Sequence, residues 1–310
     1  MAIYPTHRKH VLWKGGMLMF FSRVRIRPDV RELHLLVSGN GYGAHQLLWK
    51  LFPGEEKRSF LFREEIAREQ IPFRKGVKGE PVFYTVSESQ PISDHPLFVV
   101  DSKQYAPKIA NGERLAFRLR ANPTVARKEE GKKNSPRHDV VMDAQYHLLR
   151  EIAADMSIST NGKKLEIKKR IIEAWRQIPN SQKIEEKLRG IIDENERYVD
   201  VPTSILKPVE LLDLAFKASM DKALETWFVG RCERLGFTMV RDGFNGHMKL
   251  QAEGYQWHAL PKKGRDAGFS SVDFEGEVEV VDAGLFSKAL FEGIGPAKGF
   301  GCGLMLVRRC

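Results

Sequence analysis

A tyrosine and a histidine stand three residues apart near the start of the chain, and both side chains can take part in proton transfer. Tyr42 and His45 follow the turn Gly39-Asn40-Gly41 and lead into a helical run of apolar residues, so the two side chains share one helix face. Histidine changes charge near neutral pH, which suits acid–base catalysis, and the backbone amides at a helix N-terminus attract a phosphate. A lone histidine is more often a surface or capping residue, so the pair by itself indicates only a candidate site.

A run of five glycines near the C-terminus also calls for a physical explanation. Glycine permits positive φ angles and the close approach of another backbone or a phosphate. The dinucleotide and P-loop fingerprints both fail, because Lys298 replaces the third glycine, no Gly-Lys-Ser/Thr follows, and this run closes a helix instead of opening one. A helix C-cap and a tight turn explain one or two of the glycines. The full set is Gly293, Gly295, Gly299, Gly301 and Gly303.

Several arginines and lysines are spaced as a phosphate-binding surface requires. Arginines alternate in a strand predicted at 20–27 and in another at 113–120, and arginine suits bidentate recognition of phosphate. A solvated strand face explains the first alternation equally well. Solvent exposure is also the ordinary explanation for the charge run at 127–138, and it is nearly as good for Lys298. The candidates are Arg23, Arg25, Arg118, Arg120, Lys132, Lys133, Arg137 and Lys298.

The composition restricts the class of protein. The 310 residues carry 50 Lys+Arg and 40 Asp+Glu, and this net charge of +10 favours RNA, DNA or anionic lipid without choosing among them. No apolar run approaches the roughly 20 residues that span a bilayer. Three cysteines without a CxxC pair exclude a disulfide framework and the usual structural zinc sites, and they fit a cytoplasmic protein. We therefore expect no membrane segment, no metal and no small-molecule cofactor.

The elements that must position these residues follow from periodicity and turn signals. Residues 20–52 are predicted to form a strand, a glycine-rich turn and a helix, and further strands follow. This order of elements is typical of a small α+β domain. A helical block follows a basic linker and a short strand near Val140, and the chain then returns to strands before the final helix. The expected strands are 59–64, 81–87, 97–101, 113–120, 247–258, 272–281 and 304–307; the expected helices are 143–156, 163–178, 181–197, 208–219, 221–235 and 283–292.

Four motifs, in the same order, resemble the CasE family of the RAMP superfamily. Residues 42–53, from Tyr42 through His45 to Pro53, followed by residues 59–63, are similar to the N-terminal signature of CasE. Residues 117–123, residues 274–276 and the Gly-apolar-Gly pairs at 293–295 and 301–303 also match that family in type and order. The matching blocks cover residues 19–143 and about 221–309.

This resemblance implies an α+β fold of two tandem ferredoxin-like (RRM-like) domains, with a helical insertion in the second. The expected parts are a disordered leader at 1–18, a first domain at 19–126, a basic linker or loop at 127–138 and a second domain at 139–310. The helical block at about 144–220 departs from the family. The preferred interpretation is an accessory helical segment that packs on the rest of the domain, and the alternative is a docking surface for another subunit.

The resemblance further implies a metal-independent endoribonuclease that cleaves precursor CRISPR RNA at the base of each repeat hairpin. His45 would be the catalytic histidine and Tyr42 the assisting tyrosine, and the products would carry a 5′-hydroxyl and a 2′,3′-cyclic phosphate. The implied partners are the repeat hairpin, the mature guide RNA and other Cascade subunits, including a neighbouring backbone RAMP subunit. The alternatives are a non-catalytic RAMP subunit that only binds RNA and a general basic nucleic-acid-binding protein. The endoribonuclease hypothesis requires that His45 face a cationic cleft.

Overall fold

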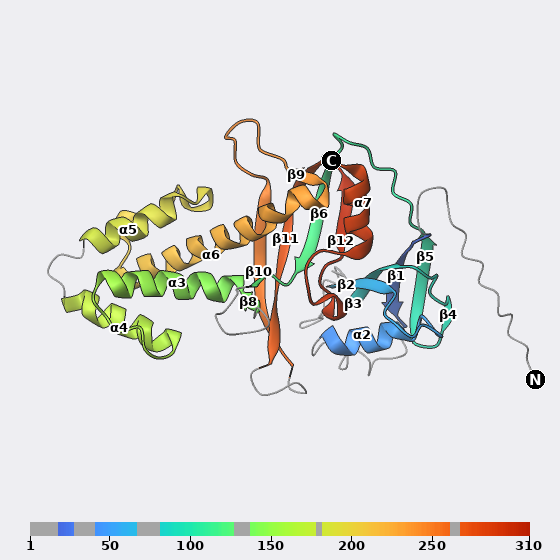
Figure 1. The fold of residues 1–310 in the computed structure, drawn as a ribbon, viewed down its shortest axis with the longest axis horizontal. Coiled ribbons are helices and arrows are strands. Elements are labelled where there is room, and N and C mark those ends of the chain that lie inside the picture. Colours follow the sequence, from blue (N-terminus) through green and yellow to red (C-terminus); the bar gives the residue numbers. More distant parts are fainter. Residues whose placement is uncertain (1–17, 28–40, 67–80, 127–136, 178–181, 261–266) are drawn as a thin grey trace, which may run out of the picture. The chain divides into compact units, whose positions relative to one another are not determined.

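The computed structural model describes residues 18–27, 41–66, 81–126, 137–177, 182–260 and 267–310 (Figure 1). The chain divides into two compact units. The first contains the described residues up to 122 together with 235–237 and 255–310, and the second contains the described residues of 123–234 together with 238–254. Most of the candidate site residues predicted from the sequence fall in the first unit.

The first unit begins with a five-stranded sheet in the order β2-β3-β1-β5-β4. β3 lies between β1 and β2 and is antiparallel to both, while helix α2 connects β1 to β2. This is the split βαβ arrangement of a ferredoxin-like domain. The elements are β1 (Phe20–Ile26), α2 (Gly41–Trp49), β2 (Phe60–Ile66), β3 (Pro81–Ser87), β4 (Asp94–His95) and β5 (Phe98–Gln104).

The sequence explains why α2 packs on this sheet. Val24 and Ile26 point into the core because the side chains of a strand alternate, and Ala44 and Leu48 lie on the buried face of the helix. These residues join a single apolar cluster with the phenylalanines of β2, β3 and β5. The helix ends at Trp49, and Gly54 has the positive φ of 86° that the following turn uses. The burial fixes the side of the sheet on which α2 lies.

A second sheet repeats the same plan with the order β10-β11-β6-β12, and a short strand β9 pairs with β11. Helix α7 connects β11 to β12, as the second helix of a ferredoxin-like domain does. The predicted α+β class with ferredoxin-like domains is confirmed. The elements are β6 (Arg114–Ala121), β9 (Phe237–Met239), β10 (Leu250–Ala259), β11 (Gly268–Val280), α7 (Ala283–Glu292), the short helix η5 (Lys298–Phe300) and β12 (Met305–Arg309).

Strand β6 belongs to a different sheet from the one expected. The strand predicted at 113–120 is expected in the first domain, whereas β6 pairs antiparallel with both β11 and β12 of the second sheet. Alternation identifies a strand but carries no information about its partner, and here the partner lies more than 150 residues along the chain, as in the pair Arg120 and Asp273. The domain boundaries at 126 and 139 remain a prediction.

The short strand expected near Val140 lies immediately before that residue, as β8 (Arg137–Asp139). Val140 and Val141 lie in the first turn of α3 (Val140–Asp155), where the Asp139 side chain accepts a hydrogen bond from the Met142 backbone N–H at 2.8 Å. This N-cap outweighs the weak strand preference of two β-branched residues. β8 pairs antiparallel with β7 (Thr124–Ala126).

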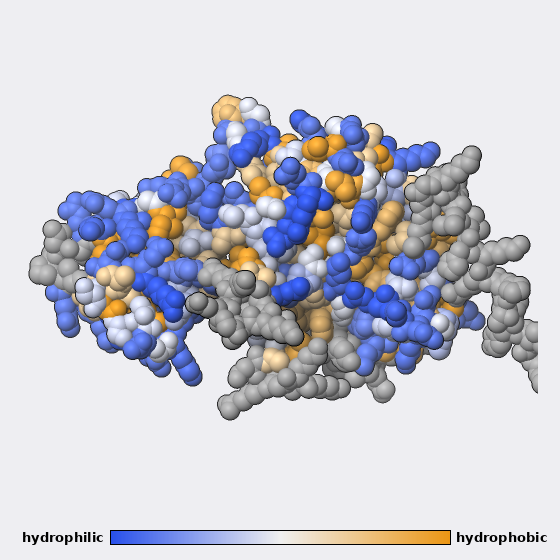
Figure 2. Space-filling view, in the orientation of Figure 1, coloured by the Kyte–Doolittle hydropathy of each residue, from blue (hydrophilic) through white to orange (hydrophobic). Residues whose placement is uncertain are grey.

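The second unit is mainly helical, and its core explains the spacing of its apolar residues. Ile167, Ile171 and Trp175 of α4 point into the same cluster as Ile184 and Leu188 of α5. The two helices expected at 208–219 and 221–235 form one helix, α6. Hydrophilic side chains dominate the visible surface of this unit (Figure 2). Its longer helices are α3, α4 (Lys164–Gln177), α5 (Gln182–Asp193) and α6 (Pro208–Cys232). Within the described ranges, no helix is both long and apolar enough to cross a membrane.

Candidate active site

His45 lies in the middle of α2, on the face of the helix that meets the sheet. Its ring stacks on Phe60 with 5.6 Å between ring centroids and meets the edge of Trp49 at 5.3 Å. The side chain is half-buried, and Nε2 is buried without a hydrogen-bond partner among the residues that the structure describes. A buried polar atom without a partner usually loses free energy of hydrogen bonding, and Nε2 of His45 is one of nine such side-chain atoms in the described part of the chain.

The surroundings of His45 keep its ring neutral. Burial lowers the pKa of His45, and the positive charge of Arg58 lowers it further. A ring that is neutral near pH 7 can accept a proton, so His45 is suited to act as a general base. Tyr42 lies in the first turn of α2, one turn before His45; its side chain is outside the described residues.

Arg58 is a cation beside this ring that no sequence pattern singled out. It stands two residues before Phe60 at the start of β2, and its side chain is exposed. A Cβ built on Gly299 would lie 3.3 Å from Arg58 Nη1, so the guanidinium touches the glycine-rich loop. No carboxylate in the described part of the chain forms an ion pair with Arg58. Therefore α2, the start of β2 and the glycine-rich loop meet around a positive charge.

Lys298 belongs to the same group of cations. Its ammonium donates a hydrogen bond to the backbone carbonyl of Glu292 at 2.6 Å, at the C-terminal end of α7. Burial lowers the pKa of Lys298, and repulsion by Arg58 contributes. Arg58 therefore places a positive charge beside His45, and Lys298 lies next to Arg58. The cationic cleft that the endoribonuclease hypothesis requires stays a prediction.

The glycine-rich loop is shaped by backbone conformation and by close packing on β2. Gly293, Gly295, Gly301 and Gly303 all have positive φ, from 77° to 94°. A Cβ on Gly293 would lie 2.8 Å from Leu61 Cδ1, and one on Gly301 would lie 3.2 Å from the Phe62 ring. Gly299 has an ordinary φ but faces Arg58. Four of the five glycines are thus required by geometry, which accounts for the array that a simple helix cap could not explain.

Four of the five arginines expected to bind phosphate form ion pairs with carboxylates. Arg23 and Arg25 of β1 both pair with Asp101, at 2.8 and 3.5 Å. On the second sheet, Arg118 pairs with Glu275 at 3.0 Å and Arg120 with Asp273 at 2.8 Å. These are cross-strand partners in neighbouring strands. Paired charges attract a phosphate less strongly than free ones, so their role in RNA binding remains a prediction.

The remaining predicted contacts are less well placed to support the site. Arg137 is exposed in β8, in the second unit. Lys132 and Lys133 lie outside the described residues. In the described part of the chain, no three His, Cys, Asp or Glu side chains are grouped so that they could hold a metal ion.

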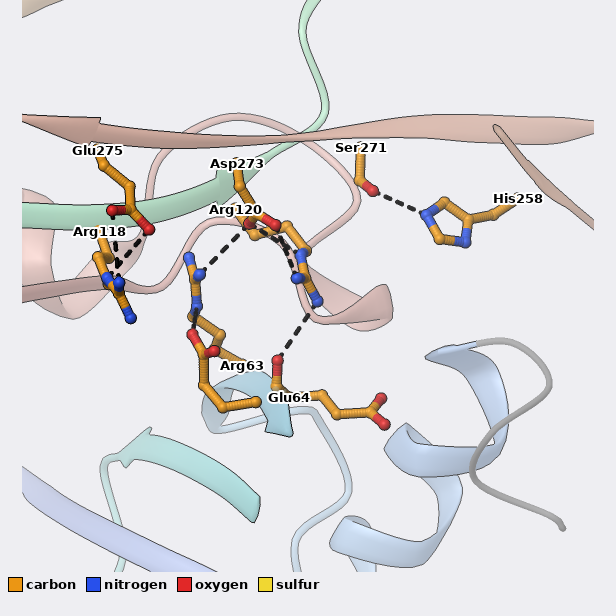
Figure 3. Close-up of polar contacts among 9 residues, drawn as sticks. Arg63, Glu64, Arg118, Arg120, His258, Ser271, Asp273 and Glu275 are labelled. Carbon is orange, nitrogen blue, oxygen red and sulfur yellow. Dashed lines mark hydrogen bonds and ion pairs between the residues drawn. The ribbon is translucent and has the colours of Figure 1, made fainter. Parts of the chain in front are cut away.

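A further arginine that was not predicted from the sequence, Arg63, ties the two sheets of the first unit together. Its side chain is only 3% exposed; it pairs with Glu65 and, at 3.3 Å, with Asp273 of β11. Figure 3 shows Asp273 between Arg63 and Arg120, and Arg120 reaches the Glu64 carbonyl at 3.3 Å. Arg63 sits in the family-like motif at 59–63, so its place in the sequence was visible but its partner was not.

Comparisons with known proteins agree with this fold. A family model described as CRISPR associated protein matches residues 19–309. The solved structure of CRISPR endoribonuclease Cse3 bound to a 19-nucleotide RNA is 21% identical, covers 94% of this chain and 99% of its own, and has a TM-score of 0.53. Cse3 from Thermus thermophilus, bound to an RNA representing a pre-cleavage complex, gives the same identity, coverages and TM-score.

These structural matches, at this identity, establish a shared fold over nearly the whole chain. No curated protein matches the sequence. The family model alone spans 291 residues from 19 to 309, which is most of the 310-residue chain, and it includes α2, β2 and the glycine-rich loop. The chain therefore belongs to the family of CRISPR-associated proteins.

Proposed function

We propose that the protein is an endoribonuclease that cleaves precursor CRISPR RNA at the base of each repeat hairpin without help from a metal ion. The observation that carries the proposal is the placement of His45: a half-buried imidazole with an unpartnered Nε2, beside Arg58 and the glycine-rich loop. Family membership and the fold shared with an RNA-bound CRISPR endoribonuclease support the choice of substrate.

The chemistry follows from what RNA itself provides. The 2′-hydroxyl attacks the neighbouring phosphorus, the new O2′–P bond forms, and the P–O5′ bond breaks. A neutral His45 takes the hydroxyl proton, and the leaving 5′-oxygen must receive a proton from Tyr42, water or the imidazolium. The products are a 2′,3′-cyclic phosphate and a 5′-hydroxyl. The bound RNA needs orientation and charge stabilisation rather than an external nucleophile.

The proposal extends to what happens after cleavage. The resemblance to CasE implies that the protein keeps its product, the mature guide RNA, and joins the Cascade complex in the cytoplasm beside a backbone RAMP subunit. The net charge of +10 suits retention of a polyanion. Hairpin RNA is read mainly by shape and backbone contacts, so the folded stem should be required for tight binding.

The test is cleavage of a labelled repeat RNA in EDTA by the wild-type protein and by His45→Ala, with Gln46→Ala as the matched control on the exposed side of α2. We expect cleavage without metal, and a rate lower by about 100-fold or more in His45→Ala, with unchanged RNA affinity. Gln46→Ala should behave as the wild type. A repeat that lacks the 2′-hydroxyl before the cut should resist.

Other outcomes would point elsewhere. A requirement for Mg²⁺ would contradict the mechanism, and cleavage of the 2′-deoxy repeat would show that the nucleophile is misassigned. Tight binding of the hairpin with no cutting would favour the non-catalytic RAMP subunit, a role for which the aromatic packing of His45 would suffice. Salt-sensitive binding without preference for the hairpin would favour a general nucleic-acid-binding protein.

A further inference from the structure

Arg58 carries a charge that no described carboxylate balances, in a place where a second cation approaches it. The other arginines of the first unit discussed above have acidic partners, among them Arg23 with Asp101 and Arg120 with Asp273. Arg58 instead faces Gly299 and lies close enough to Lys298 and His45 to depress the pKa of both. Crowded like charges are unfavourable in the free protein and become favourable when an anion binds between them.

The geometry also favours a phosphate as this anion. Arg58 leads into β2 two residues before Phe60, the ring on which His45 stacks, so guanidinium and imidazole are placed by one short segment. A guanidinium offers a planar fork of donors that matches two oxygens of a phosphate. The Arg58 side chain is exposed and can reach an incoming strand, while the glycine at 299 leaves room for close approach.

We propose that Arg58 is a catalytic residue that grips the two non-bridging oxygens of the scissile phosphate while His45 takes the proton. This inference rests on the proposed function, because it concerns the same site. As the 2′-oxygen adds to phosphorus and the 5′-oxygen leaves, negative charge builds up on those two oxygens. A guanidinium already in position stabilises that charge in the transition state more than in the bound substrate.

The experiment compares Arg58→Ala and Arg58→Lys with Lys57→Ala, a matched control at the neighbouring exposed lysine. Single-turnover cleavage of the repeat RNA should fall about 100-fold or more in Arg58→Ala, partly recover in Arg58→Lys and stay unchanged in Lys57→Ala. Affinity for the 2′-deoxy repeat should change far less than the rate. An equal rate in Arg58→Ala and wild type would overturn the inference.

The pH–rate profile distinguishes an electrostatic role of Arg58 next to His45 from a purely structural role. Removing Arg58 removes one cause of the lowered pKa of His45, so the acidic limb of the pH–rate profile should move to higher pH in Arg58→Ala. A profile that keeps its position would contradict a direct role beside the imidazole.

A third measurement works even if the RNA is not cut. Inorganic phosphate bound between Arg58 and His45 should raise the pKa of the His45 ring, followed by NMR, in the wild type and in Lys57→Ala but not in Arg58→Ala. A wild type that binds phosphate in this way but never cleaves would refute the proposed function and keep the anion site. The same phosphate response in Arg58→Ala, or none in the wild type, would refute the anion site itself.

Discussion

At the scale of single residues, the backbone decides where side chains are tolerated around the site. Gly303 has a φ of 94°, donates its N–H to the Arg120 carbonyl at 2.7 Å and accepts from Ile294 N at 2.9 Å. A Cβ there would lie 3.0 Å from the Ile294 carbonyl oxygen, a backbone atom that cannot move aside easily. Gly112 has a similar φ of 80°, but a Cβ on that residue would have nothing within 4 Å. Substitution of Gly112 therefore tests the free-energy cost of a positive φ alone, whereas substitution of Gly303 adds the cost of a steric clash.

We expect Gly112→Ala to lower the free energy of unfolding by about 1 kcal/mol, the cost of a left-handed φ for alanine. Gly303→Ala should cost about 1–3 kcal/mol more, because it adds steric conflict with the backbone. Urea unfolding followed by circular dichroism measures both. Equal losses in the two variants would mean that the loop relaxes around the new methyl group.

At the scale of elements, strand β2 serves both sheets through the alternation of its side chains. Phe60 and Phe62 face α2 and lie beneath His45, while Leu61 belongs to a separate apolar cluster on the other side. Arg63 follows on that other side and reaches Asp273 of β11. A shift of β2 by one residue would exchange these faces and remove the platform of His45. The buried ion pair therefore helps to fix the register of the strand that supports the site.

Arg63→Met should lower the free energy of unfolding by about 3 kcal/mol, because it leaves the Glu65 and Asp273 carboxylates with less compensation. The control is Arg114→Ala, which removes a pair with Glu279 on the second sheet whose arginine side chain is 61% exposed. That change should cost less than about 1 kcal/mol. Urea unfolding of both variants gives the comparison, and similar losses would show that the Arg63 pairs contribute no more than a surface pair.

At the scale of the whole molecule, three histidines make the folded state sensitive to mild acid. Burial is the main cause of a lowered pKa for His45, His95 and His258. At His95 the reason is specific, since Nδ1 accepts a hydrogen bond from the Leu97 N–H at 3.1 Å and must stay unprotonated to do so. The unfolded chain binds protons at these histidines near pH 6.5, while the folded chain binds them only at lower pH.

Stability should therefore rise with pH in this range and be lost as the pH falls below about 6.5, by about 1.4 kcal/mol for each unit of pKa lowering. Urea unfolding between about pH 7.5 and about pH 5.5, where most carboxylates stay ionised, should show this slope. Burial raises the pKa of Glu64, and this carboxyl group opposes the histidines. His95→Asn should flatten it, because one of the three proton-binding differences is gone. An unchanged slope in that variant would assign the pH dependence to other groups.

Much of the molecule followed from local sequence patterns. Periodicity identified α2, α7, most of the helices of the second unit and the strands β1, β3, β6 and β11, since burial of one face imposes its own spacing. The motifs placed His45 and the glycine-rich loop, and both came together in the structure. The family and the α+β class were readable for the same reason: they depend on short segments whose residues constrain one another locally.

Tertiary structure alone decided which charges are free and which strands are partners. The sequence pattern predicts that Arg118 and Arg120 are available to bind phosphate. In the structure, Glu275 and Asp273 pair with them from a strand more than 150 residues away in the sequence. Arg58 had no pattern to mark it, yet packing sets it between His45 and the loop that carries Lys298. Strand register and charge balance arise from contacts between distant segments, and no local spacing encodes them.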